Sequence, residues 1–172
     1  MRETPYSLNI QEVMKFLPHR APFLLVDRIL EIQVPDSPEQ EQAQILVGTK
    51  VIGLKNVTYN EPPFQGHFPE LPIFPGVLLT EVMAQVSGFG LYPYIQKKYG
   101  DSQRFNFFLV GVDEARFRKP VVPGDTLRIE SELTRVRGNK LLTFQSIILV
   151  EGQKVAEAKI LANFSLSTQS GA

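Results

Sequence analysis

One histidine and one glutamate stand close together in a stretch of this chain that combines rigid and apolar residues. His67 lies in a proline-rich loop, and Glu81 lies in the apolar run that follows Pro75 and Gly76. An imidazole acts as a base near neutral pH, and a carboxyl group surrounded by apolar side chains holds its proton more tightly than one in water. The segment from Gly66 to Gln85 therefore contains a candidate base and a candidate acid.

The start of the apolar run supplies a third chemical group. Proline before glycine at this point is compatible with a helix start, where the first backbone N–H groups have no partner within the helix. Such groups stabilise negative charge on an oxygen. A base at His67, an oxyanion site at Gly76 and an acid at Glu81 suit one reaction class. In that class a proton is removed beside a carbonyl and a departing hydroxyl is protonated.

Each of these residues also has a structural interpretation. A single histidine beside apolar residues is most often a structural histidine, and a glutamate in an apolar helix often faces solvent or pairs with a lysine. Proline-rich loops are usually only loops. Composition and spacing alone leave both interpretations open.

The composition limits which partners and cofactors are expected. The chain has 172 residues, a length that suits a single domain covering residues 1–172. Its 18 basic and 18 acidic side chains cancel, so we expect neither nucleic acid nor a membrane as a partner. With no cysteine, and with His19 and His67 as the two histidines, we expect no metal and no cofactor. No signal-like or membrane-spanning stretch is visible, which predicts a cytoplasmic protein.

Two segments have a helical pattern. Asn9 and Glu12 have the spacing of a capping box, and the short helix that they begin is predicted to stop at Pro18. Its apolar face is predicted to consist of Ile10, Val13, Met14 and Leu17. The run from Val77 to Tyr99 is apolar on almost every side, which predicts a long buried helix.

The remaining segments have the pattern of strands. Phe23–Val34 predicts a first strand, followed by an extended polar loop over residues 35–48, and strand-like sequence resumes in ILVGTKVIGLKNVTY. From Phe105 onward four strand-like stretches follow, and the last three should form an antiparallel meander with one wet face. We predict five or six strands and an α+β domain, with one sheet curled around the helix. Residues 167–172 are expected to be a flexible tail.

Three stretches carry a resemblance to a known family: LPHRAPFLLVDRI, NEPPFQGHFPELPIFPGVLLTEVMAQ and GVDEARFRKPVVPGD. Together they resemble the 3-hydroxyacyl-[acyl carrier protein] dehydratases of bacterial type II fatty acid synthesis, over about Ile10 to Phe164. The resemblance implies the hot dog fold, an antiparallel sheet wrapped around a long central helix. It also implies a homodimer, commonly assembled as a trimer of dimers, in which the histidine of one chain faces the glutamate of the other.

The resemblance assigns roles to four residues. His67 matches the catalytic histidine, Glu81 the catalytic glutamate, Gly76 the glycine whose amide polarises the thioester carbonyl, and Gln85 the glutamine that follows the acid. It implies dehydration of a (3R)-hydroxyacyl thioester on acyl carrier protein to a trans-2-enoyl thioester, without a cofactor. His19 and Arg20 belong to the LPHR motif, which we interpret as structural.

Further residues are expected to hold the acyl chain and the carrier protein. Candidates for an apolar substrate tunnel, each of which could equally be ordinary core, are Phe74, Val77, Leu78, Phe89, Tyr92 and Phe108. At Phe108 some relatives carry a tyrosine thought to gate the tunnel, so chain-length preference stays open. Candidates for docking the acidic carrier protein are Arg116, Arg118 and Lys119, although a mixed-charge run of this kind usually only contacts solvent. Glu70 adds a charge near His67 that could raise its pKa.

Three other functions compete with the dehydratase. A thioesterase of the same fold would use a carboxylate-activated water and would not require the His67 loop. A bifunctional dehydratase/isomerase usually has aspartate as its acid, which Glu81 argues against. A noncatalytic acyl-carrier or lipid-binding module would function without His67.

Overall fold

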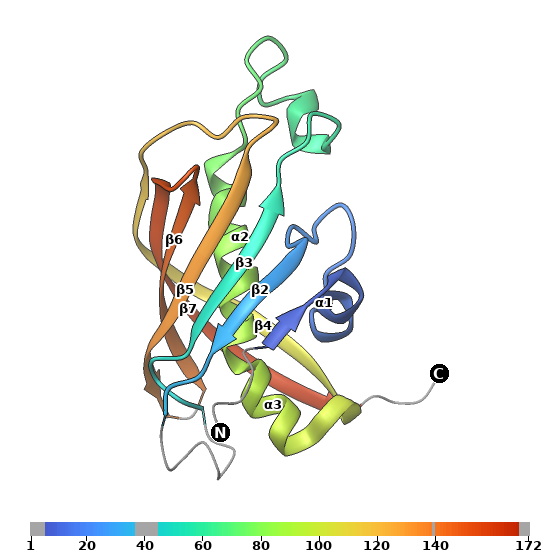
Figure 1. The fold of residues 1–172 in the computed structure, drawn as a ribbon, viewed down its shortest axis with the longest axis vertical. Helices are drawn as coiled ribbons and strands as arrows, with labels where there is room; N and C mark the ends of the chain where they lie inside the picture. The colour runs from blue at the N-terminus through green and yellow to red at the C-terminus, as the bar shows by residue number, and fades with distance from the viewer. Residues whose placement is uncertain (1–5, 37–44, 139, 169–172) are drawn as a thin grey trace.

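The protein folds into one seven-stranded sheet with the strand order β1-β2-β3-β5-β6-β7-β4 (Figure 1). The computed structural model describes residues 6–36, 45–138 and 140–168. Every strand pairing is antiparallel. The strands are β1 (Tyr6–Leu8), β2 (Arg28–Gln33), β3 (Lys50–Asn56), β4 (Gln103–Phe117), β5 (Thr126–Arg137), β6 (Leu141–Val150) and β7 (Gln153–Thr168). The sequence analysis predicted five or six strands and missed β1, which is too short to show an alternating pattern.

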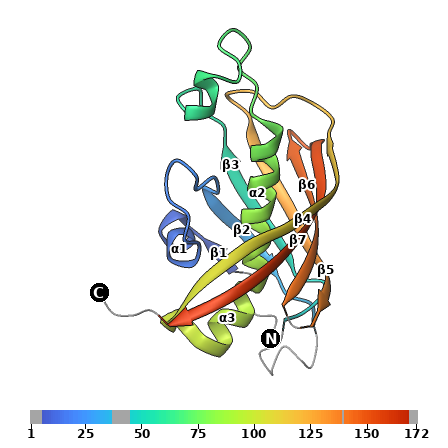
Figure 2. The same cartoon turned by 180° about the vertical axis from the view of Figure 1, so that it is seen from behind.

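The first part of the predicted buried helix lies inside the curve of this sheet. It consists of three consecutive segments, α2 (Gly76–Gly88), the short 3-10 helix η3 (Phe89–Leu91) and α3 (Tyr92–Tyr99). β3, β4, β5, β6 and β7 all contact α2, and Figure 2 shows the sheet wrapping around it. Most of α2 from Leu79 onward is buried, as expected for a helix that is apolar all round. The predicted α+β architecture is therefore confirmed. The predicted burial was wrong for α3, where Ile95 is buried but Lys97 and Lys98 are exposed.

The predicted N-terminal helix is α1 (Ile10–Phe16). The capping box is present: Asn9 accepts hydrogen bonds from the Gln11 and Glu12 amides, and the Glu12 carboxylate accepts one from the Asn9 amide. The predicted apolar face was partly wrong, because Ile10 and Met14 are exposed. The buried face consists of Val13, Phe16 and Leu17. Phe16 turns inward because its ring packs on Phe89, Tyr92 and Phe105.

The predicted first strand begins later than expected. β2 starts at Arg28, and the backbone of Phe23 and Leu25 pairs with a side chain instead of a neighbouring strand. Gln85 of α2 donates to the Phe23 carbonyl at 2.8 Å and accepts from the Leu25 amide at 3.0 Å. This apolar segment has the sequence pattern of a strand, but its backbone groups form hydrogen bonds with the Gln85 side chain and not with a neighbouring strand.

The C-terminal meander of β5, β6 and β7 is antiparallel as predicted. β7 continues to Thr168, where it pairs with β4, so residues 167 and 168 belong to a strand and not to the expected tail. Residues 169–172, and residues 37–44 of the predicted loop, lie outside the described part of the chain. No helix in the described ranges is both long and apolar enough to cross a membrane.

A cluster of three hydroxyl groups joins α2 to the sheet. Ser87 of α2 lies 2.8 Å from Ser131 of β5 and 3.2 Å from Ser146 of β6, measured between hydroxyl oxygens. Ser131 and Ser146 face each other in the β5–β6 register and lie 2.8 Å apart. All three serines are buried. They form a polar contact within an otherwise apolar helix–sheet interface.

Candidate active site

His67 is held in one orientation by the chain on both sides of it. Its amide donates to the Pro63 carbonyl at 3.0 Å, and its carbonyl accepts from the Ile73 amide at 3.2 Å. Its ring nitrogen Nδ1 lies 2.8 Å from the Ile73 carbonyl oxygen. A carbonyl oxygen only accepts, so Nδ1 carries the proton and donates. The other ring nitrogen, Nε2, therefore has the lone pair that a base requires.

The loop around His67 is largely exposed. Phe68 stacks on the imidazole with ring centroids 4.2 Å apart. Glu70 is exposed, and among the described residues it makes no ion pair with His67. The structure therefore shows no direct contact between the anticipated charge of Glu70 and the imidazole of His67.

Gly76 is the first residue of α2, as the Pro75-Gly76 pattern indicated. Pro75 is the N-cap and provides no side-chain hydrogen bond to the helix start. None of the described residues accepts a hydrogen bond from the Gly76 amide, so this N–H is available to a ligand oxygen. A β-carbon at Gly76 would lie 3.2 Å from the ring of Phe117, which packs beside this amide.

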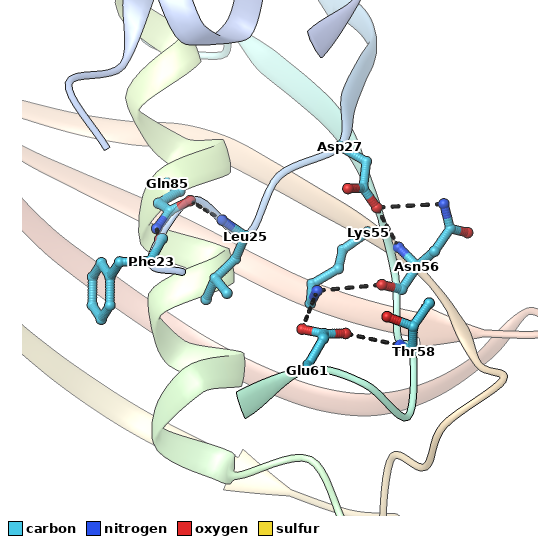
Figure 3. Close-up of polar contacts among 8 residues, drawn as sticks. All are labelled: Phe23, Leu25, Asp27, Lys55, Asn56, Thr58, Glu61 and Gln85. Atoms are coloured by element: carbon cyan, nitrogen blue, oxygen red, sulfur yellow. Dashed lines mark hydrogen bonds and ion pairs between the residues drawn. The ribbon is translucent and has the colours of Figure 1, made fainter. Parts of the chain in front are cut away.

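Glu81 is partly buried on α2 and is oriented by the glutamine one turn further along. Gln85 Nε2 donates to Glu81 Oε1 at 2.9 Å. The same amide group holds the segment of Phe23 and Leu25, as Figure 3 shows, so Gln85 fixes both the helix and that segment. With Oε1 engaged, Oε2 is the oxygen of Glu81 available for proton transfer to a substrate.

His19 also contacts Glu81, although the sequence analysis interpreted it as structural. Its Nε2 lies 3.6 Å from Glu81 Oε1. Burial lowers the pKa of His19, the charge of Glu81 acts in the opposite direction, and Arg20 adds to the lowering. The buried Nδ1 has no hydrogen-bond partner among the described residues, so a second ring proton would have no acceptor. The LPHR motif drew attention to His19, but nothing in the sequence showed that Glu81 lies beside it.

The structure does not gather the predicted site residues into a single pocket. No hydrogen bond or ion pair joins His67 to Glu81 within the described part of the chain. Of the tunnel candidates, Phe74 and Phe89 are buried in the core, Leu78 and Tyr92 are partly buried, and Val77 and Phe108 are exposed. A groove of about 330 Å³ lies over β2, β3, β5 and β6, and none of these candidates lines it.

The three candidate docking residues differ in how freely their charge is presented. Arg118 pairs with Glu157, and Lys119 donates to the Gln153 side chain. Hydrogen bonds from Lys154 and Arg118 hold the pKa of Glu157 below its usual value. Arg116 is exposed on β4 and bonds to the Ala115 carbonyl, without an acidic partner among the described residues. Arg116 therefore presents the least compensated charge of the three.

Comparisons with known proteins identify the family of the chain. Residues 17–159 match the model of the FabA-like domain. The 3-hydroxyacyl-[acyl-carrier-protein] dehydratase FabZ of Bordetella petrii is 46% identical over 158 residues, which cover 90% of this chain and 94% of that protein. FabZ of Sinorhizobium medicae is 48% identical over 154 residues, with 90% and 88% covered.

Solved structures agree on the fold. The dehydratase heterocomplex ApeI:P from Xenorhabdus doucetiae matches with a TM-score of 0.62 at 21% identity, over 94% of this chain and 91% of that one. A hot-dog-like protein from Thermanaerovibrio acidaminovorans matches with a TM-score of 0.57 at 17% identity, over 75% and 88%. The fold is thus the hot dog fold, and the chain belongs to the FabA-like family, among relatives of the 3-hydroxyacyl-[acyl-carrier-protein] dehydratases FabZ.

Proposed function

We propose that this protein dehydrates (3R)-hydroxyacyl-[acyl carrier protein] to trans-2-enoyl-[acyl carrier protein] and water in fatty acid elongation, and that it does so in the cytoplasm. The observation that carries this proposal is the fixed tautomer of His67, whose Nδ1 donates to the Ile73 carbonyl and leaves Nε2 as a base. The names of the curated relatives support the same reaction. No cofactor is required by this chemistry.

The three groups act in one sequence of bond changes. His67 Nε2 takes the C2 proton while the Gly76 N–H stabilises the negative charge that develops on the thioester oxygen. The C2=C3 double bond forms as the C3–O bond breaks, and protonated Glu81 gives its proton to the departing hydroxyl, which leaves as water. The cycle ends with the proton on His67 and none on Glu81, so a proton must return from the imidazole to the carboxylate through solvent. Hydration of the enoyl product is the same path in reverse.

The substrate is delivered by acyl carrier protein, which is acidic. In this proposal its docking surface is Arg116, Arg118 and Lys119, which lie on both sides of Phe117 in the sequence at the end of β4; the ring of Phe117 lies beside Gly76. The acyl chain would lie along Phe74, Val77, Leu78, Phe89, Tyr92 and Phe108. The exposed members of that set, Val77 and Phe108, are available to a ligand or to a second chain.

The working unit in this proposal is a homodimer, further assembled as a trimer of dimers. Support comes from β4, a terminal strand of the sheet that pairs with β7 on one side. Phe108, Leu109 and Val110 are 55%, 45% and 59% exposed, which leaves a continuous apolar stretch along this edge. Long apolar edges of this kind mark association surfaces. In such a dimer, His67 of one chain would serve Glu81 of the other.

An assay with crotonyl thioester tests the reaction. We expect the purified protein to remove the enoyl absorbance without releasing free thiol, whereas a thioesterase releases thiol. His67→Ala and Glu81→Gln should each lower kcat on the order of 10²-fold or more, because each removes an acid–base group. Dehydratase activity that survives both substitutions would contradict the assigned roles, and function that persists after His67→Ala would favour a noncatalytic binding module.

Mixing the two inactive variants tests the shared site. Subunits carrying His67→Ala are exchanged with subunits carrying Glu81→Gln. If each site takes its histidine and its glutamate from different chains, some mixed dimers hold one intact site and activity returns. A mixture that exchanges subunits and stays inactive would place both residues of a site in one chain.

A further inference from the structure

Lys55 is a buried positive charge that the proposed reaction does not use. It lies near the end of β3, and 4% of its surface is exposed. Its Nζ lies 2.8 Å from Glu61 Oε2 and 3.2 Å from the Asn56 carbonyl oxygen (Figure 3). An ion pair removed from water gains little net stability, since the cost of desolvating two charges offsets their attraction. The main effect of the Lys55–Glu61 pair is therefore to fix the position of the segments that it joins.

On one side, Lys55 fixes the beginning of the loop that carries His67. Glu61 is the N-cap of the short 3-10 helix η2 (Pro62–Gln65), which leads directly into that loop. While Oε2 of Glu61 binds Lys55, Oε1 accepts from the Thr58 amide at 2.8 Å, as Figure 3 shows. The carboxylate thus has a partner on both oxygens, and η2 starts from a fixed point.

On the other side, Lys55 contacts the end of the same loop. Its Nζ lies over the ring of Phe74 at 5.3 Å from the ring centroid, a cation–π contact. Phe74 is buried, and its amide donates to the Val121 carbonyl at 2.7 Å. One ammonium group therefore touches residues that stand before and after His67 in the chain.

His67 is bonded to both of the segments that Lys55 holds. Its amide bonds to Pro63, which belongs to η2, and its ring and carbonyl bond to Ile73, the residue before Phe74. Most of the residues between these points are exposed and gain little from packing. The direction of the imidazole ring thus depends on how the two ends of the loop are held.

We propose that Lys55 is a positioning residue for His67. The buried ammonium group of Lys55 holds Glu61 and Phe74 against β3 and thereby orients Nε2 of His67 toward the substrate. This inference rests on the proposed function for its kinetic consequence but not for its structural one. A neutral side chain of similar length would fill the same space but would lose both the ion pair with Glu61 and the cation–π contact with Phe74.

The kinetic test compares four variants with the wild-type enzyme. These are Lys55→Met, Glu61→Gln, the double variant, and Lys50→Met as a matched control. Lys50 lies on the same strand and pairs with Glu132 at 3.6 Å, but both side chains are exposed. We expect Lys55→Met to lower kcat about 10²-fold with little change in KM, because a base displaced by about 1 Å loses that much. Lys50→Met should stay within about twofold of wild type.

The double variant separates the clamp from a general loss of stability. If Lys55 and Glu61 act as one unit, the double variant should be no slower than Lys55→Met alone. Thermal unfolding is measured for each variant, and kcat is measured well below the lowest midpoint. Where Lys55→Met fails to fold, Glu61→Gln carries the test, because it keeps an oxygen for the Thr58 amide and removes only the charge.

Hydrogen exchange of the His67 and Ile73 amides provides a readout that does not depend on activity. Both amides donate hydrogen bonds inside the loop, so we expect faster exchange in Lys55→Met and unchanged exchange in Lys50→Met. Unchanged exchange in a folded Lys55→Met protein, or equal kcat losses in Lys55→Met and Lys50→Met, would overturn the inference. A wild-type protein without dehydratase activity would overturn the proposed function, and the exchange experiment would still decide whether the clamp exists.

Discussion

Gln85 makes three hydrogen bonds with distances between 2.8 and 3.0 Å, one with the candidate acid Glu81 and two with the backbone of Phe23 and Leu25. It orients Glu81 and fixes the backbone at Phe23 and Leu25. Because its side chain is buried, no water is free to replace these bonds if the amide is lost. Gln85 is thus both a support for the acid and a structural link to the segment before β2.

We expect Gln85→Leu to lower both kcat and stability. Leucine fills the volume but leaves the buried Leu25 amide without an acceptor, which costs roughly 1–3 kcal/mol. Urea unfolding measures the free energy of unfolding, and the crotonyl thioester assay measures kcat. Gln96→Leu is the matched control, since Gln96 bonds to Asp101 at an exposed site. Equal stability losses in the two variants would contradict the role given to Gln85.

His19 should make the stability of the protein depend on pH below about 6.5. Its pKa is lowered in the folded state, chiefly by burial, so the unfolded chain takes up the proton first as the pH falls. Its contribution to the free energy of unfolding is thus complete above the ordinary histidine pKa of 6.5 and is lost as the pH falls from there through the lowered folded-state pKa. The groups facing His19 are Glu81 and Arg20, which act in opposite directions.

His19→Gln is expected to flatten this part of the profile. Urea unfolding is measured for both proteins between about pH 5 and 8, the range in which histidine titrates. The quantity of interest is the difference in slope, since other groups titrate in both proteins alike. Identical slopes would show that His19 takes its proton equally in the folded and unfolded states.

Among the secondary-structure elements, those that begin with a local sequence motif were predictable from sequence. The capping box of Asn9 and Glu12 begins α1 as expected, and Pro75-Gly76 begins α2. Where the partner lies far along the chain, the sequence did not reveal the contact. Phe23 pairs with Gln85 and not with a strand, and His19 contacts Glu81, because folding joins segments that sequence spacing does not relate.

The two candidate catalytic residues show the same division. The residue types of His67 and Glu81 were recognisable from their setting, but the Nδ1 contact to Ile73, which leaves Nε2 of the neutral imidazole without a proton, became visible only in the structure. Lys55 gave no sequence signal, since a lysine at the end of a strand is usually exposed. Its burial follows from Glu61 and Phe74 folding back over β3.

β3 and α2 approach each other closely at Gly53 and Val86, and a substitution there can test this contact. A β-carbon added at Gly53 of β3 would lie 2.5 Å from a methyl group of Val86 on α2, closer than atoms pack. We expect Gly53→Ala to destabilise the protein by about 1–3 kcal/mol, because either the strand or the helix must move. Urea unfolding provides the measurement.

Val86→Ala removes the clashing methyl groups and serves as the partner variant. In the double variant, the loss should be smaller than the sum of the two single losses, because the new methyl group occupies the space that valine vacated. Additive losses would show that Gly53 is required for a reason other than contact with Val86.

At the level of the whole molecule, the free edge of β4 is expected to hold two chains together. Val110→Lys places a charge in the exposed apolar stretch of Phe108, Leu109 and Val110, where pairing of two edges would bury it. We expect this variant to be monomeric by light scattering and to lose dehydratase activity while keeping a wild-type circular dichroism spectrum.

Val47→Lys is the control for this experiment, because Val47 is a similarly exposed valine that lies outside β4. It should leave both the mass and the activity unchanged. A Val110→Lys protein that remains dimeric would place the interface elsewhere, and a fully active monomer would show that one chain contains a complete site.

The hydroxyl cluster of Ser87, Ser131 and Ser146 bears on how α2 is seated along its own axis. Apolar contacts have no directional requirement, whereas a hydrogen bond forms only within a narrow range of distance and angle. Three buried hydroxyls that satisfy one another do so at one axial setting of the helix. The three serines therefore hold α2 at one position along its axis. Through Ser87, near the C-terminal end of α2, they also fix the position of Glu81 on the same helix.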